Sequence, residues 1–179
     1  MWELTDPKPV KLFIGILAAD ENCLAAAIEA LQSEFGRIDL VSDIWPFTQT
    51  GYYSKETGEN ILRQFVGIER LIDPGELAEV KHRTNALEKE LAGRLNMNLL
   101  RPVNLDPGII GPSKLVLATT KNYAHRIYIG SRMYAEVTLI YEKGKWQPLH
   151  YTYPDYRQPV YHNFFDKVRS KLVEQMRTI

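Results

Sequence analysis

VKLFIGIL, residues 10–17, is a nearly continuous apolar run near the start of this 179-residue chain. A short apolar run of this kind predicts a strand that is buried on both faces. We therefore expect a central buried strand here, and the segments that follow decide what packs around it.

The segment after this run has the features of a helix. Asp20 can cap its first turn, and Gly36 can end it. Apolar residues recur between them at helical spacing, at Leu24, Ile28, Leu31 and Phe35. Residues 38–47 then predict a second strand, which Pro46 weakens at its end.

The next segments repeat this order. Residues 61–71 predict a third strand, and the run Asp73-Pro74-Gly75-Glu76 is a strong helix start. Residues 99–105 predict a fourth strand. The order β-α-β-β-α-β is that of the ferredoxin-like split βαβ arrangement.

The rest of the chain predicts short strands at residues 114–119, 125–129, 133–141 and 145–149, and then a helix from about residue 159. We expect one α+β domain over residues 1–179. Its ferredoxin-like βαββαβ core would be extended by an antiparallel β-meander and a C-terminal helix.

Composition limits the function classes. The 22 basic and 22 acidic residues cancel, which argues against a broad electrostatic grip on nucleic acid. A polar start predicts that no signal peptide is present, and no apolar run reaches the roughly 20 residues of a membrane span. The single cysteine, Cys23, has no partner for an internal disulfide. We expect a cytoplasmic protein that does not bind membranes.

Several runs resemble one family. They are KPVKLFIG at 8–15, YYSKETG at 52–58, KHRTNALE at 81–88, VNLDPGIIGPSKLVLATTKNYAHRIYIG at 103–130, YAEVTLIY at 134–141 and TYPDYR at 152–157. The chain is similar over essentially its whole length to domain-of-unknown-function family 4416, a group of bacterial and archaeal proteins. Thr57 stands where the family pattern has methionine. Because the family has no assigned activity, the resemblance implies a grouping and no mechanism.

Polar side chains are dense between residues 104 and 136, at predicted strand ends and short loops, which suits a binding site. The ligand-binding candidates there are Asn104, Lys114, Thr119, Thr120, Lys121 and Arg126. The catalytic candidates are Asp106, His125 and Glu136. The alternative is structural, because Asp106-Pro107-Gly108 is also a turn signature and residues 119–122 could be an ordinary strand exit.

Two other groups of residues bear on this site. Glu136 lies mid-strand, where it would pair with Arg126, Lys114 or a metal, or else lie on a solvated face. On the second predicted helix, Lys81, Thr84, Asn85 and Glu88 lie beside the leucine stripe. Lys81 and Asn85 would then reach a cleft at the sheet edge, although a surface network of polar side chains also fits this spacing.

Aromatic loops could close the cleft. Tyr52 and Tyr53 in one loop, and the tyrosines of residues 151–156 in another, could stack on a ring, although loop tyrosines more often serve ordinary packing. We assign no metal site. His125 with Asp106 and Glu136 is the one arrangement that could hold a catalytic metal, with Mg²⁺ as the cofactor left open.

Two function classes follow. The first is a small enzyme or ligand-binding protein whose cleft recognises an anionic ligand, either a phosphorylated metabolite or a nucleotide; whether it is catalytic stays open. Lys114, Lys121 and Arg126 would hold the anion, Asp106 and Glu136 would act as acid/base groups or Mg²⁺ ligands, and His125 would shuttle a proton. The second is a non-catalytic interaction module that binds partners through a sheet edge or face. RNA binding is the weakest class, because the net charge is zero. The oligomeric state is left open.

Overall fold

The computed structural model describes residues 2–48 and 54–178, and its centre is a large, antiparallel, mixed-order sheet. Strands and helices alternate in the first part of the chain, in the order β1 (Val10–Ala18), α1 (Glu21–Phe35), β2 (Ile38–Val41), β3 (Trp45–Pro46), α2 (Ser54–Thr57), β4 (Leu62–Ile72), η1 (Pro74–Glu76), α3 (Leu77–Leu95) and β5 (Val103–Ile110). The second part contains β6 (Lys114–Thr119), β7 (Ile127–Gly130), β8 (Met133–Glu142), β9 (Lys145–Pro148), η2 (Asp155–Arg157) and α4 (Pro159–Gln175).

The sheet runs in the order β2-β4-β1-β5-β6-β8-β7 among the described residues, with β3 paired to β4 and β9 to β8. Each of these pairs is antiparallel. The apolar run that opens the chain forms β1, between β4 and β5, and each of its nine residues is buried. The prediction of a buried strand is thus confirmed.

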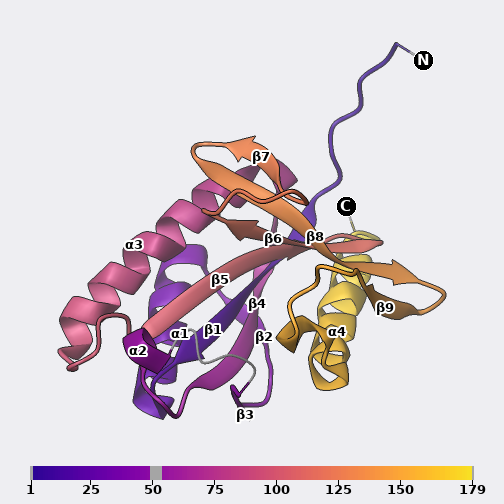
Figure 1. Ribbon diagram of the computed structural model, residues 1–179. Helices are drawn as coiled ribbons and strands as arrows, with labels where there is room; N and C mark the ends of the chain where they lie inside the picture. The colour runs from indigo at the N-terminus through magenta and orange to yellow at the C-terminus, as the bar shows by residue number, and fades with distance from the viewer. Residues whose placement is uncertain (1, 49–53, 179) are drawn as a thin grey trace.

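The two faces of the sheet carry separate cores. Alternate residues of β1, such as Leu12 and Ile14, pack with buried residues of α1 and α3. Phe13 points to the other face, where it joins Phe65 and aromatic residues of α4 such as Phe165. Figure 1 shows α1 and α3 on one side of the sheet and α4 on the other. The mixed α+β class is therefore as predicted.

The predicted helix starts are also present. Asp20 accepts a hydrogen bond from the backbone of Cys23 at 2.8 Å, and Asp73 forms a capping box with Glu76. Gly36 ends α1 with a φ of 91°, a conformation that favours glycine.

Two strand boundaries differ from the prediction. The expected strand at residues 38–47 is two short strands, because Ser42 leaves the ladder and bonds the backbone of Phe65 through its hydroxyl and its own N–H. The expected strand at residues 99–105 is β5, and it continues to Ile110. Asp106, Pro107 and Gly108 lie inside this strand, so they do not form a turn.

A buried lysine fixes the end of α4 to the sheet. The Lys11 ammonium, fully buried, donates to Asp39 at 2.8 Å, to the Ile68 carbonyl at 2.8 Å and to Gln175 at 3.1 Å. Burial of a charge is tolerated when hydrogen bonds replace water in this way.

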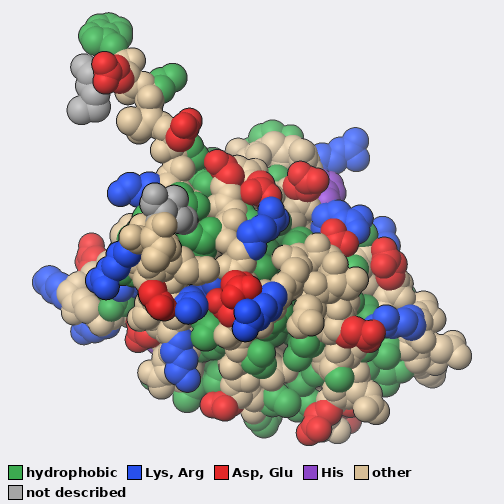
Figure 2. Space-filling view, turned by 180° about the vertical axis from the view of Figure 1, so that it is seen from behind, with side chains coloured by type: hydrophobic (Ala, Val, Ile, Leu, Met, Phe, Trp, Pro, Cys, Tyr) green, Lys and Arg blue, Asp and Glu red, His purple; other side chains and the backbone are tan. Residues whose placement is uncertain are grey.

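None of the helices in the described part of the chain combines the length and the apolar composition needed to cross a membrane. At the start of the chain, residues 2–9 extend away from the body of the protein, as Figures 1 and 2 show. Figure 2 also shows that basic and acidic side chains intermix on that face, so it presents no broad basic surface.

Candidate functional site

The sheet opens between β5 and β6. β5 pairs with β1 along its whole length, but it pairs with β6 only from Gly108 to Ile110. Pro107 has no N–H to donate to a neighbouring strand, so the ladder stops beside it. Asn104 and Asp106 therefore lie on a part of β5 that β6 leaves uncovered.

Side chains of α3 take the place of the missing strand. The backbone N–H of Leu105 donates to the Glu88 carboxylate at 2.7 Å, and the Leu105 carbonyl accepts from the Lys81 ammonium at 2.8 Å. Lys81 and Glu88 lie seven residues apart, which places them on one face of the helix. They satisfy both backbone groups of a buried strand residue, so the prediction that polar residues of this helix reach the sheet edge is confirmed for Lys81 and Glu88.

Glu88 also fixes an arginine at the edge of the opening. Its carboxylate accepts from Nε of Arg101 at 2.9 Å and from Nη2 at 2.5 Å. Burial raises the pKa of Glu88 above its ordinary value, although Lys81 and Arg101 attract its charged form. The Arg101 side chain stays 30% exposed.

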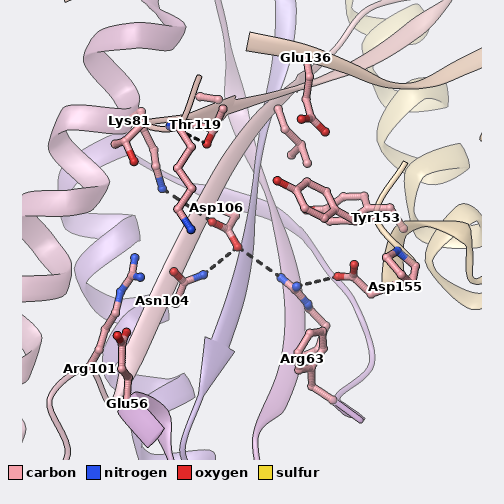
Figure 3. A pocket seen from close by; sticks show the side chains of 17 residues that line it. Glu56, Arg63, Lys81, Arg101, Asn104, Asp106, Thr119, Glu136, Tyr153 and Asp155 are labelled. Atoms are coloured by element: carbon pink, nitrogen blue, oxygen red, sulfur yellow. Dashed lines mark hydrogen bonds and ion pairs between the residues drawn. The ribbon is translucent and has the colours of Figure 1, made fainter. Parts of the chain in front are cut away.

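Asp106 lies at the middle of the opening, as Figure 3 shows. The Asn104 amide donates to its Oδ2 at 2.7 Å, the Lys81 ammonium is 3.7 Å from its Oδ1, and Nη1 of Arg63 is 4.0 Å from Oδ2. The Asp106 side chain is 29% exposed. It is thus a carboxylate held among donors and still open to a ligand.

Arg63 is a buried arginine between two carboxylates. Its Nη2 donates to Asp155 at 2.8 Å, and its guanidinium lies 5.2 Å from the ring centres of both Phe47 and Phe65. Burial raises the pKa of Asp155, outweighing the attraction of Arg63. The Arg63–Asp155 pair joins β4 to the segment before α4, on the side of the opening away from α3, as Figure 3 shows.

Glu136 is buried and paired. It accepts from Nε of Arg126 at 2.8 Å and lies 3.1 Å from Nε2 of His125, whose ring stacks on Tyr151. Arg126 also donates to the Tyr153 hydroxyl at 2.5 Å. The predicted pairing of Glu136 with Arg126 is confirmed, and the solvated-face alternative is wrong.

These elements enclose a cavity of about 530 Å³, within the range of small-molecule sites. Most of the residues that line it are polar: Glu56, Arg63, Lys81, Arg101, Asn104, Asp106, Thr119, Thr120, Lys121, Glu136, Tyr153 and Asp155. The apolar part of the wall comes from Phe47, Leu117, Ala118, Pro154 and Tyr156.

Seven of the predicted site residues line this cavity: Lys81, Asn104, Asp106, Thr119, Thr120, Lys121 and Glu136. His125 and Arg126 lie behind Glu136 and support it. The expectation that all the predicted cations share one cleft is wrong for Lys114, which is exposed at the opposite end of β6 from Thr119, and for Arg126, which lies outside the lining and is paired with Glu136 and Tyr153. Asn85 is also outside the lining, and Tyr52 and Tyr53 fall outside the described residues.

Sequence reasoning missed the second half of the site. Arg63 lies in a strand that also carries Gln64, Glu69 and Arg70, so the sequence did not single it out as a buried charge. Arg101 directly precedes a proline and gave no sign of its role. Tyr153 and Asp155 belong to the segment that was predicted to stack on a ligand. Their hydrogen bonds with Arg126 and Arg63 depend on the tertiary fold, so the sequence did not indicate them.

The structure tests the predicted arrangement of acidic residues and a histidine around one metal. No group of three His, Cys, Asp or Glu side chains in the described ranges is placed to hold an ion. Glu136 and His125 bond each other, whereas Asp106 lies among Asn104, Lys81 and Arg63. The arrangement of Asp106, His125 and Glu136 around one metal is therefore not formed.

Comparison with known proteins agrees with the predicted resemblance. A family model described as a domain of unknown function (DUF4416) matches residues 8–172. No curated protein and no solved structure matches the chain.

Proposed function

The chain belongs to the DUF4416 family, a domain of unknown function, and from the geometry of its cavity we propose that it binds a small phosphorylated metabolite or nucleotide. The ligand would lie in the opening between β5 and β6, with its anionic group toward the cations of the wall.

The observation that carries this proposal is that Arg101 is fixed in one orientation and still partly exposed. Glu88 takes two of the five N–H groups of its guanidinium, and the side chain remains 30% exposed on the cavity wall. An arginine that is already fixed in one orientation loses little entropy when it binds a phosphate, and its planar fork matches two phosphate oxygens.

Other donors around the cavity support the same ligand class. Lys121 and the hydroxyls of Thr119 and Thr120 come from the end of β6 and the loop after it. They approach from a different element than Arg101, as expected for a site that surrounds an anion. Two carboxylates of the wall, Glu136 and Asp155, are already paired with arginines and oppose an anion less than unpaired acids would.

We further propose that residues 10–110 form a ferredoxin-like core, extended by the β6–β9 strands and α4. The order β2-β4-β1-β5, antiparallel throughout, and the packing of α1 and α3 on one face support this assignment. In this view the ligand site lies where the core meets its extension.

A second candidate, the interaction module, is favoured by the edge strand β7. Ile127 is 73% exposed and Tyr128 is 58% exposed on this strand at one end of the sheet. Exposed apolar residues on an edge strand favour pairing with another chain.

Binding measurements separate the candidates. We expect thermal shifts of the purified protein with nucleotides or phosphorylated sugars, because a ligand that binds only the folded state stabilises it by about 2.7 kcal/mol at 100 times its Kd. Arg101→Lys keeps a charge beside Glu88 but loses the guanidinium fork, and Lys121→Ala removes a cation. Each should weaken binding by about 10-fold, the value of one charge-assisted hydrogen bond.

Lys114→Ala is the matched control, since Lys114 is a surface lysine at the start of β6, outside the cavity. It should leave the Kd unchanged. A panel without any shift would contradict the proposal and favour the interaction module.

A further inference from the structure

The two oxygens of Asp106 have different surroundings. Oδ2 accepts a hydrogen bond from the Asn104 amide at 2.7 Å and faces Arg63. Oδ1 is 3.7 Å from the Lys81 ammonium, a distance for an ion pair but too long for a hydrogen bond. Within the described part of the chain, Oδ1 therefore has an attractive charge nearby and no hydrogen-bond donor.

We infer that Asp106 accepts a hydrogen bond from a hydroxyl group of the ligand, so that the ligand class is a hydroxyl-bearing sugar phosphate, as a free sugar phosphate or as the ribose phosphate of a nucleotide. This inference rests on the proposed function, and it assigns Asp106 to specificity.

The local charges favour a neutral donor over a cation. Asp106 and Asp155 carry two negative charges, and Lys81 and Arg63 beside them carry two positive charges. A ligand ammonium placed at Oδ1 would meet the Lys81 ammonium at close range, which is repulsive. A hydroxyl supplies the missing hydrogen bond without adding charge.

Asp106 is also rigidly placed, as a specificity residue must be. It lies inside β5, opposite Gly15 of β1. A side chain at Gly15 would come within 2.8 Å of Nη1 of Arg63, so the glycine makes room for the guanidinium that faces Asp106. Asn104, which is 2% exposed, donates a hydrogen bond to Oδ2 of Asp106 and so fixes that side of the carboxylate.

The rest of the wall suits a sugar. Lys81 and Arg101 lie on one side of the cavity, Tyr153 lies opposite, and Asp106 lies between them, as Figure 3 shows. Tyr153 is held by its bond to Arg126, and Leu117 and Ala118 complete an apolar surface. Such walls fit the carbon face of a sugar ring while polar groups bind its edge.

The test compares three phosphorylated probes by calorimetry on the full chain: ribose 5-phosphate, 2-deoxyribose 5-phosphate and butyl phosphate, which has no hydroxyl. We expect wild type to prefer ribose 5-phosphate over butyl phosphate by about 10- to 100-fold, the value of a hydrogen bond to a charged group. Asp106→Asn should remove most of this preference and change the Kd for butyl phosphate by less than about 2-fold.

Asp43→Asn is the control, because Asp43 is an exposed aspartate outside the cavity. If Asp106→Asn fails to fold, the wild-type comparison of the three probes still tests whether the site recognises a hydroxyl group. Equal binding of all three by wild type, or an equal loss of all three in Asp106→Asn, overturns the inference and leaves the proposed function standing. Binding of none of them, nor of any nucleotide, overturns the proposed function itself.

Discussion

Two glycines allow charged and aromatic side chains to lie directly against the central strands. A side chain at Gly15 would meet Arg63, and one at Gly108 would lie 2.6 Å from the Phe13 ring and 2.8 Å from the Val116 carbonyl. Close approach of this kind is possible only without a Cβ atom. Gly108 also lies at the point where β5 and β6 separate.

Gly108→Ala should therefore destabilise the protein. Neither the Phe13 ring nor the Val116 backbone can move freely, and overpacking of this kind lowers the free energy of unfolding by about 1–3 kcal/mol. Urea unfolding followed by circular dichroism measures the change.

Gly93→Ala is the matched control, since Gly93 lies exposed in α3 with no atom within 4 Å of an added Cβ. Alanine there should raise the free energy of unfolding by about 0.5–1 kcal/mol through its helix propensity. Equal effects of the two substitutions would contradict the packing argument.

Single residues also show where sequence reasoning succeeds and fails. Lys81 could be assigned to the sheet edge because its place on the helix, beside the leucine stripe, follows from local periodicity. Arg63 could not be assigned, because its partners Asp106 and Asp155 come from segments far along the chain. Lys114 was misplaced although the predicted strand at residues 114–119 already puts it and Thr119 at opposite ends of six residues.

At the scale of elements, the β7–β8 hairpin supports the wall of the cavity through one ion pair. The side chains of Arg126 and Glu136 are 8% and 1% exposed, and Arg126 also holds Tyr153. Removing one partner of a buried ion pair leaves an unpaired buried charge. This destabilises the protein much more than replacing both partners with apolar residues.

Arg126→Met should lower the free energy of unfolding by about 3 kcal/mol, because Glu136 would stay buried without its arginine. The double variant Arg126→Met/Glu136→Met should recover at least half of this loss. Chemical denaturation of the single and double variants measures the coupling.

Arg70→Met serves as the control, since Arg70 is 67% exposed and its contact with Glu76 is long, at 3.9 Å. It should change stability by less than about 0.5 kcal/mol. A double variant that is less stable than Arg126→Met would show that the pair itself is not the source of the effect.

Elements with local signals were predicted well. The caps at Asp20 and Asp73, the central strand β1 and the apolar face of α4 follow from spacing that the sequence displays directly. β5 was cut short because Asp106-Pro107-Gly108 has the composition of a turn. Its extended form is maintained by β1 on one side and by Lys81 and Glu88 on the other, which are tertiary contacts.

For the molecule as a whole, buried carboxylates should make stability depend on pH. Burial raises the pKa of both Glu88 and Asp155, so the folded state keeps their protons at pH values where the unfolded chain has lost them. The folded state then binds more protons, and the free energy of unfolding falls as pH rises above the ordinary carboxyl value of about 4. Asp155→Asn should remove its part of this fall.

Urea unfolding of wild type and Asp155→Asn at a series of pH values tests this. The stability of wild type relative to the variant should decrease as pH rises from about 4. Glu34→Gln is a control with the opposite expected sign, because a hydrogen bond from Arg83 lowers the pKa of Glu34. The free energy of unfolding of wild type should therefore increase relative to that variant as pH rises through the range below about 4.3. Parallel slopes for the two comparisons would contradict both assignments.

The bonds that close the cavity join residues that are distant in the chain. Arg63 and Asp155 are 92 residues apart, Arg126 and Tyr153 are 27 apart, and Lys81 and Leu105 are 24 apart. Contacts of long sequence separation form late, because closing long loops costs chain entropy before any contact is gained. Before the 151–156 segment has left the ribosome, the central sheet strands have already been synthesised, but the cavity cannot yet form. The cavity can therefore form only once residues up to the 151–156 segment have been synthesised.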